Sequence, residues 1–326
     1  MPLTVRWGTV TAVHERADGL IRLEVDGTPS VAFTSLTGAI EEGDIVLVNT
    51  QARDLGLGSG VGDVVYVNLT RGLRLGAEQG AHVVSLPYTP GQLARRYAEE
   101  DVTPAERLDG TPVVCCSLHS QVVPVCAALA GRRVAYVQAG GGALPVSLSD
   151  ALRALRARNL IGFTVAVAPC FDADLQCVTL ASALLVAAAR GAEAVVCGIG
   201  PGIVGTATRF GHGGLAAADA ANTAVALGGR AVVAPRVSFA DPRARHQGLS
   251  HHTRAVLELC LGPVAVAWPL GLDAPLGITV ETVGAGDWET ACTKLPLEHM
   301  GRGPDEDPWF FASAFAAGRV ARQLLG

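Results

Sequence analysis

Histidines and other polar side chains gather where apolar runs of the sequence end. Five of the eight histidines lie in such segments, and they are His119, His212, His246, His251 and His252. Imidazole exchanges protons near neutral pH, binds anions when protonated and binds metal ions when neutral. These segments therefore indicate a site for proton transfer, anion binding or metal binding.

The apolar runs before these segments are short and continuous, which is typical of parallel strands buried on both faces. Six strands are expected, at residues 112–117, 133–138, 163–169, 194–199, 231–236 and 263–269. Helical stretches rich in Ala and Leu lie between them, at 123–131, 148–159, 175–191, 214–229 and 251–262. This alternation predicts a doubly wound, mainly parallel α/β sheet of the Rossmann-like type. Because ligands bind at the carboxyl ends of such strands, we expect the polar segments to form one site.

A glycine-rich segment follows the fourth of these strands. Gly200, Gly202 and Gly205 match G-x-G-x-x-G, in which backbone amides approach an anion closely. The motif does not follow the first strand, and Arg236 replaces the acid that dinucleotide sites place after the next strand. An arginine there suits a 2′-phosphate, so an NADP-binding oxidoreductase stays open as an alternative. A nest of amides with Thr206, Thr208 and Arg209 also fits phosphate or carboxylate generally, and a glycine turn needed only for packing is the remaining interpretation.

The five histidines, with Asp172 or Asp174, are enough ligands for a catalytic metal that keeps one position open. The leading candidates among them are His119, Asp172, Asp174 and His212. The pair Asp172 and Asp174 follows a strand and suits Mg²⁺, although N-capping of a helix that starts near Leu175 is the favoured role for one of them. Because His251 and His252 are adjacent, we expect only one of the two to point inward.

Nucleophilic catalysis has weaker support. Ser120 lacks the small neighbours of a nucleophile elbow, since Leu118 and Val122 flank it at two residues on either side. Cys116 lies near His119, but a buried, unreactive thiol is the favoured interpretation.

Composition excludes several classes of protein. The 326 residues carry a net charge of −5, and Lys294 is the only lysine among 25 basic residues, so nucleic acid is not an expected partner. No apolar run is long enough to cross a membrane. The eight cysteines form no CxxC pair and are expected to be reduced core thiols of a cytoplasmic protein. The excess of Arg over Lys suggests a bacterial source. The apolar content of 49% suggests a homo-oligomer, because exposed apolar surface tends to be buried against partners.

The chain divides into three parts in this interpretation. Residues 1–75 alternate in the manner of a small all-β, barrel-like domain. Residues 76–110 form a linker with a helix in the stretch 86–101 that starts at Thr89-Pro90, and residues 111–326 form the α/β domain. A last helix from Trp309 carries Phe310, Phe311, Phe315 and Val320, which are expected to dock on the sheet or on another subunit.

Three motifs carry a resemblance to a known family. They are SLHSQ at residues 117–121, GIGPGIVGTATRFGHGG at 198–214 and GDIVLVNT at 43–50. With them, the chain resembles an uncharacterised bacterial family, a domain of unknown function, over most of its length. The resemblance implies no activity, cofactor or catalytic residue.

The function that these observations favour is a hydrolase or transferase for a small anionic, for example phosphate-bearing, metabolite. His119, His212 and Asp172 are the expected catalytic residues. The expected substrate-binding residues are Ser117, Ser120, Gln121, Gly200, Gly202, Gly205, Thr206, Thr208, Arg209, Arg243, His246 and His251. A non-catalytic metabolite-binding or assembly protein is the main alternative. The sequence identifies no cofactor.

Overall fold

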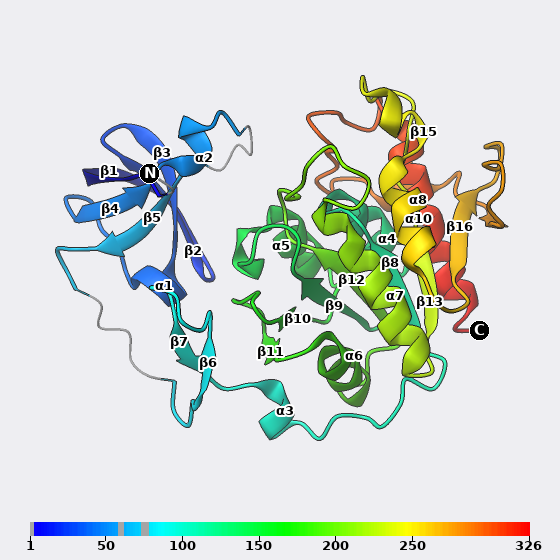
Figure 1. The fold of residues 1–326 in the computed structure, drawn as a ribbon, viewed down its shortest axis with the longest axis horizontal. Helices are drawn as coiled ribbons and strands as arrows, with labels where there is room; N and C mark the ends of the chain where they lie inside the picture. The colour runs from blue at the N-terminus through cyan, green and yellow to red at the C-terminus, as the bar shows by residue number, and fades with distance from the viewer. Residues whose placement is uncertain (1–2, 58–61, 73–77) are drawn as a thin grey trace. The chain divides into compact units, whose positions relative to one another are not determined.

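The computed structural model describes residues 3–57, 62–72 and 78–326 (Figure 1). The chain forms two compact units, residues 1–96 and 97–326. Residues 73–77, where the predicted barrel meets the predicted linker, lie outside the described part of the chain. None of the helices in the described part is long and apolar enough to cross a bilayer.

The first unit contains a closed five-stranded barrel, as the sequence predicts. Its strands are β1 (Val5–Ala17), β2 (Leu20–Val25), β3 (Thr28–Phe33), β4 (Ile45–Asn49) and β5 (Asp63–Asn68), in the order β1-β2-β3-β5-β4. Two short helices, α1 (Thr34–Thr37) and α2 (Gln51–Asp54), lie in the connections. Alternate side chains such as Val10, Leu23 and Val46 fill the barrel core, which is the reason for the period-two pattern of these strands.

The helix predicted over residues 86–101 is wrong. The structure has a small hairpin, β6 (Val83–Ser85) with β7 (Leu93–Arg95), and then the single-turn helix α3 (Ala98–Asp101). Residues 93–95 pair with 83–85 instead of forming a helix, and the positive φ of Leu86 and Tyr88 belongs to the turn between the two strands.

The second unit is built on an eight-stranded, all-parallel sheet, and all six predicted strands are present. The strands are β8 (Pro112–Cys116), β9 (Val134–Ala139), β10 (Phe163–Val167), β11 (Leu175–Cys177), β12 (Ala194–Ile199), β13 (Arg230–Ala234), β16 (Ala265–Pro269) and β17 (Glu281–Val283). Their spatial order is β11-β10-β9-β12-β8-β13-β16-β17. Strand β11 lies within the predicted helix 175–191, and α6 starts only at Leu180 with Thr179 as its N-cap. The prediction that an aspartate caps a helix near Leu175 is therefore wrong.

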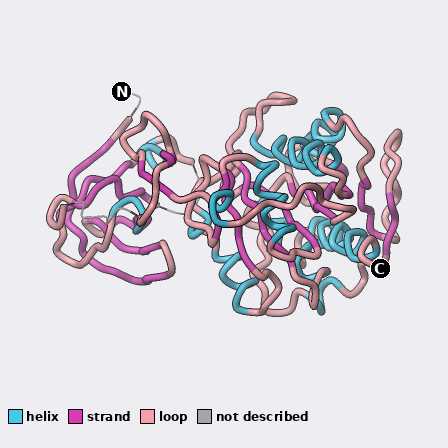
Figure 2. Tube along the Cα trace, turned by 90° about the horizontal axis from the view of Figure 1, so that it is seen from below, coloured by secondary structure: helices cyan, strands magenta, loops and turns pink. Residues whose placement is uncertain are grey.

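Helices cover both faces of this sheet (Figure 2). One face packs against α4 (Val122–Ala128), α5 (Asp150–Ala157), α9 (Trp288–Ala291) and α10 (Pro308–Gln323). The other packs against α6 (Leu180–Ala189), α7 (Ala216–Ala226) and α8 (His251–Leu259). Neighbouring strand residues face opposite layers, Val114 toward the first and Val113 toward the second, which explains why each strand is apolar throughout.

The last helix, α10, docks on the sheet of its own chain. Phe310, Phe311 and Phe315 are fully buried there. At Gly318 a Cβ atom would lie 2.4 Å from the carbonyl oxygen of Val125, so this glycine permits the close crossing of α10 and α4. Of the two predicted docking surfaces, the sheet is the one observed.

The order of the strands creates a switch point at the centre of the sheet. Strand β12 lies between β9 and β8, whose connections lead to α5 and α4 on one face. The connections after β12 and β13 lead to α7 and α8 on the other face. Loops that leave in opposite directions open a crevice at the carboxyl ends of the strands, where α/β proteins place their ligands.

Candidate functional site

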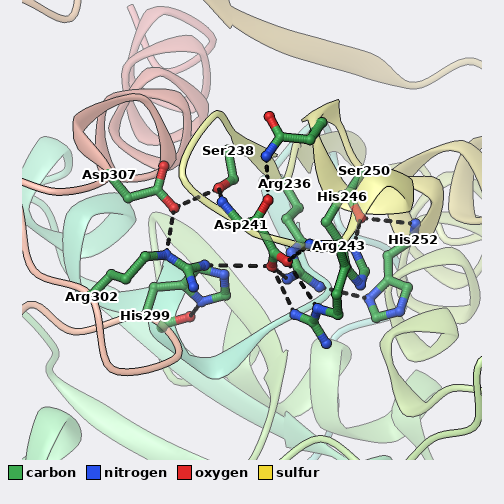
Figure 3. Close-up of polar contacts among 12 residues, drawn as sticks. Arg236, Ser238, Asp241, Arg243, His246, Ser250, His252, His299, Arg302 and Asp307 are labelled. Atoms are coloured by element: carbon green, nitrogen blue, oxygen red, sulfur yellow. Dashed lines mark hydrogen bonds and ion pairs between the residues drawn. The ribbon is translucent and has the colours of Figure 1, made fainter.

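Polar side chains meet at this carboxyl edge from three connections and the tail of the chain. Figure 3 shows those of the connection after β13 and of the tail. The connections follow β8, β12 and β13, and the tail contributes residues 296–307 just before α10. The connection after β13 contains the two-stranded ribbon β14 (Val237–Ser238) and β15 (Gly248–Leu249).

The carboxylate of Asp241 is the centre of a buried ion cluster. It accepts hydrogen bonds from Arg236 Nη2 at 3.0 Å, from Arg243 Nη2 at 2.7 Å and from Arg302 Nη2 at 3.5 Å. Burial alone would raise the pKa of Asp241, but the hydrogen bonds and charges of Arg243 and Arg236 outweigh it and hold that pKa well below its usual value. Asp241 is therefore ionised at neutral pH.

A second buried carboxylate, Asp307, joins the same cluster. It accepts from Ser238 Oγ at 2.6 Å and from Arg302 Nε at 3.3 Å. Three guanidinium groups thus face two carboxylates, which leaves one positive charge in excess. In addition, the buried Nε of Arg236 has no partner among the described residues. The cluster has the charge and a free donor for an anion.

Four histidines lie against this cluster. The ring of His212 stacks on that of His252 with centroids 3.8 Å apart, and His251 and His246 lie 4.4 and 4.9 Å from His252. Ser250 holds this arrangement, because its Oγ accepts from the backbone N–H of His252 at 3.2 Å and bonds His246 Nδ1 at 2.7 Å.

Both His251 and His252 approach His212, with ring centroids 5.8 and 3.8 Å away. The prediction that only one of them points inward is wrong. The two residues occupy the first turn of α8, directly after its N-cap Ser250, and the 212 loop lies beside that turn, so both rings reach it.

These histidines are neutral at pH 7. Burial, reinforced by Arg236, lowers the pKa of His252 to about 2 and that of His246 to about 3. His212 is 6% exposed, and burial lowers its pKa as well. By hydrogen-bond geometry neither ring nitrogen of His212 has a partner in the described part of the chain, although the backbone of Arg209 lies near enough to offset part of the fall in pKa.

One group of possible metal ligands stands out in the described residues. Ring nitrogens of His212, His251 and His252 lie within 4.8 Å of one another. Of the four leading candidates for metal ligands, only His212 belongs to this group. His251 and His252 come from the wider set of histidines that the sequence offered as ligands.

His119 lies elsewhere and has both ring nitrogens in use. Nδ1 lies 3.0 Å from the Ile199 carbonyl oxygen, and Nε2 lies 2.7 Å from Ser149 Oγ. Ser149 in turn caps α5 by accepting from the Leu152 N–H. Burial lowers the pKa of His119 to about 4, so the ring donates from Nδ1 and accepts at Nε2. These bonds join the ends of β8 and β12 to α5, which is a structural role.

Asp172 and Asp174 do not form a pair. Asp172 accepts from Ser147 Oγ at 3.0 Å. Asp174 accepts from the backbone N–H of Thr164 at 2.7 Å and from Arg156. Thr164 is at the amino end of β10, so Asp174 is at the edge of the sheet opposite the histidines. Neither contact is with the histidine cluster.

The glycine motif serves the packing of two loops. A Cβ atom at Gly200 would lie 2.1 Å from the Ala143 carbonyl oxygen, and one at Gly213 would lie 1.9 Å from that of Gly141. The triple glycine at 140–142 and the 200–214 loop therefore touch backbone to backbone. At Gly202, where φ is +71°, a Cβ atom would meet nothing within 4 Å.

Residues 205–212, at the tip of the 200–214 loop, make their contacts within the loop and with α8. Gly205 pairs with His212 across a narrow turn, which holds His212 in place. Thr206 and Thr208 bond each other at 2.8 Å, and Arg209 forms an ion pair with Glu258 on α8. The structure thus brings His212 to the site but leaves these three exposed side chains outside it.

The SLHSQ segment contributes mostly to the frame of the site. Gln121 is buried and bridges the Leu118 N–H and the Ala234 carbonyl, and Ser117 Oγ donates to it. Ser120 Oγ lies 3.1 Å from His299 Nδ1 beside a cavity of about 320 Å³ that Gly200–Ile203 also line. The thiol of Cys116 is buried, which raises its pKa well above the usual value and leaves it unreactive.

Several residues of the site were not among the expected catalytic or substrate-binding residues. They are Arg236, Asp241, His252, His299, Arg302 and Asp307. Arg236, Asp241 and His252 lie at or after the end of a predicted strand. Arg236 and Asp241 are five residues apart and of opposite charge, which suggests an ion pair. His299, Arg302 and Asp307 lie in a polar loop of the tail, where no sequence signal indicates a return to the sheet.

Comparison with known families agrees with the motifs. Residues 29–318 match the family model described as protein of unknown function (DUF3866). The chain belongs to the DUF3866 family. A search of curated proteins found no match, so family membership carries no activity to this DUF3866 chain. The match includes every element of the site described above.

Proposed function

We propose that this chain is an enzyme, a hydrolase or transferase, that acts on a small anionic metabolite at the carboxyl edge of its sheet. One observation carries the proposal, namely the excess of three guanidinium groups over two carboxylates in a cluster that is largely withdrawn from water. A buried excess charge is costly unless a counter-ion neutralises it, and an oxyanion is the counter-ion that arginine binds best.

Access to the cluster supports the same proposal. The side chain of Arg243 is 36% exposed, whereas that of Arg236 is 2% exposed. An anion can therefore reach Arg243 from solvent and extend toward the buried donors. Phosphate esters and carboxylates both have the geometry for paired contacts with guanidinium groups.

Proton transfer is assigned to His212 in this proposal. It is neutral and buried, and its ring nitrogens are free to accept or donate a proton at a bound substrate. His119 keeps a positioning role because both of its nitrogens are bonded, and Asp172 is given no part in the chemistry.

Two alternatives use the same region. A metabolite-binding or assembly protein would hold an anion at the arginines without turnover. An NADP site has less support, because Arg236 is already paired with Asp241 and Gly200 packs against Ala143.

Ligand screening by thermal unfolding tests the anion site. Phosphate, sulfate, dicarboxylates, sugar phosphates and NADP are added one at a time, and a ligand that binds only the folded chain raises Tm. We expect a phosphate or carboxylate compound to raise the Tm of the native chain. For Arg243→Gln, the ligand concentration needed for the same rise in Tm should be at least ten times higher. Arg245→Gln removes the same charge from an exposed position two residues away and is the matched control.

Turnover separates the enzyme from the binding protein. Each stabilising ligand is incubated with the chain, with and without water-soluble acceptors, and products are followed by mass spectrometry. Product that forms with the native chain but not with His212→Gln supports the proposal that the chain is an enzyme. Binding without product indicates the binding protein, and the absence of any stabilising anion contradicts both.

Location and assembly follow from other features. All eight cysteines are free, and all but Cys260 are buried, which supports a reducing, cytoplasmic setting. Leu261, Leu270 and Leu276 are at least 71% exposed, which supports a homo-oligomer. Sedimentation that finds only a 33.5 kDa species would contradict the oligomer. With a net charge of −5, we propose neither nucleic acid nor membrane as a partner.

A further inference from the structure

We propose that His212, His251 and His252 bind a divalent transition-metal ion of the zinc type. The group combines a loop residue after β12 with the first turn of α8, so three ring nitrogens from two segments lie within 4.8 Å of one another. This inference goes beyond the proposed function and changes one part of it. A His212 ring whose lone pair binds the ion cannot accept a proton, so His212 serves as the proton acceptor only in the metal-free chain.

The spacing suits a site that closes around an ion. Zinc binds imidazole nitrogen at about 2.0–2.1 Å, so two ligands of a tetrahedral site are about 3.4 Å apart. The largest separation in the group is 4.8 Å, which rotations of the side chains reduce. No carboxylate belongs to the group, and an all-imidazole set favours zinc, copper or nickel over magnesium or calcium.

Unpartnered nitrogens provide a second and independent observation. Both ring nitrogens of His212 and Nε2 of His251 are buried without a hydrogen-bond partner in the described ranges. His212 itself is 94% withdrawn from solvent, since its exposure is 6%. Buried polar atoms nearly always have partners in folded proteins, and an ion would supply the missing one.

One contact competes with the ion. Arg236 Nη1 lies 3.3 Å from His252 Nδ1, which accepts there. A neutral imidazole has one lone pair, so His252 cannot bind a metal and accept from Arg236 together, whichever nitrogen binds the ion. Metal binding therefore releases this donor of Arg236, while the Arg236 ion pair with Asp241 can persist.

Charge then predicts what completes the site. Three histidines leave one tetrahedral position open. With a dication beside the excess charge of the arginines, the fourth ligand is anionic, either hydroxide or an oxygen of the substrate. This part rests on the proposed function, because it uses the same arginines to hold the anion.

Metal titration of the full chain tests the site. The chain is stripped with a chelator and titrated with zinc by calorimetry, and then with cobalt, whose visible spectrum reports tetrahedral coordination. We expect one tightly bound ion, with at least a tenfold loss of affinity in His212→Ala and in His251→Ala. His14→Ala removes an exposed histidine of the barrel and should bind as the native chain does.

Folding of each variant is checked by circular dichroism. If His212→Ala does not fold, the Tm of the native chain is the test. Zinc should raise this Tm, and a chelator should lower it again. Failure of the stripped native chain to take up an ion, or equal uptake by folded His212→Ala, overturns the metal site.

Phosphate added to the cobalt-loaded chain tests the fourth ligand. We expect a change in the cobalt spectrum that Arg243→Gln reduces. Tight metal binding with no response to phosphate or carboxylates supports the metal site and overturns its anionic ligand, so the two proposals fail separately.

Discussion

The guanidinium group of Arg236 and the carboxylate of Asp241 form an ion pair that is almost completely withdrawn from water. Nη2 and Oδ2 are 3.0 Å apart, and the side chains are 2% and 0% exposed. Burial lowers the pKa of Arg236 to about 10, yet the group remains charged at neutral pH. Removal of either partner from such a pair leaves an uncompensated buried charge.

Asp241→Asn should therefore destabilise the chain strongly. We expect the free energy of unfolding to fall by about 3–5 kcal/mol, the range for a broken buried pair. Urea unfolding measures the change. Asp273→Asn makes the same substitution at an exposed position, and we expect a change within about 0.5 kcal/mol there. Equal effects of the two substitutions would contradict the buried cluster.

Acid should destabilise the chain in part through His119. The pKa of this ring is 6.5 unfolded and about 4 folded, so the unfolded chain binds its proton first. Its contribution to stability is complete above pH 6.5 and declines as the pH falls toward 4. At 1.36 kcal/mol for each pKa unit, the loss amounts to about 3 kcal/mol.

His119→Gln removes this titration. Urea unfolding at a series of pH values should show a shallower decline below pH 6.5 for the variant than for the native chain. The difference between the two slopes is the quantity that matters, because the substitution itself shifts both ends of the curve. Parallel curves would show that His119 does not titrate differently on folding.

Gly142→Ala should disrupt the contact between the two glycine loops. A Cβ atom at Gly142 would lie 2.2 Å from the Gly200 carbonyl oxygen, whereas one at Gly140 would meet nothing within 4 Å. We expect Gly142→Ala to lower stability by about 1–3 kcal/mol, as overpacking does. Gly140→Ala should change it by less than about 0.5 kcal/mol. Thermal and urea unfolding of both variants check this, and an equal response would refute the loop contact.

The strands of the sheet could be predicted because their signal is local. Each buried strand, such as 112–116 or 194–199, is a continuous apolar run bounded by Gly, Pro or polar residues. The barrel was equally visible from its alternating pattern. The helix predicted from Thr89-Pro90 is wrong because Thr-Pro before a charged stretch is also compatible with a turn. The pairing of residues 93–95 with 83–85 decides between the two, and the local pattern does not show it.

The site was only partly predictable because it depends on contacts between distant segments. His212, Arg243, His246 and His251 meet as the convergence of loops at one sheet edge suggested. His119 follows β8 at the same edge, but Ile199 and Ser149 engage its ring, and nothing in the local pattern shows that. Asp172 and Asp174 both follow β10 in the sequence. Between them the chain runs back along the sheet, so Asp174 lies at the amino end of β10 and bonds Thr164 there.

The position of β12 has a consequence for the order in which the chain is made. Strands β8 and β9 flank it in space, but both precede it in sequence. During synthesis, a nascent chain that ends at Cys177 holds β8 and β9 with unpaired edges and no central strand between them. Exposed strand edges of this kind invite pairing with other chains. The edges of β8 and β9 that face each other can therefore be closed only after the chain has been made as far as Ile199.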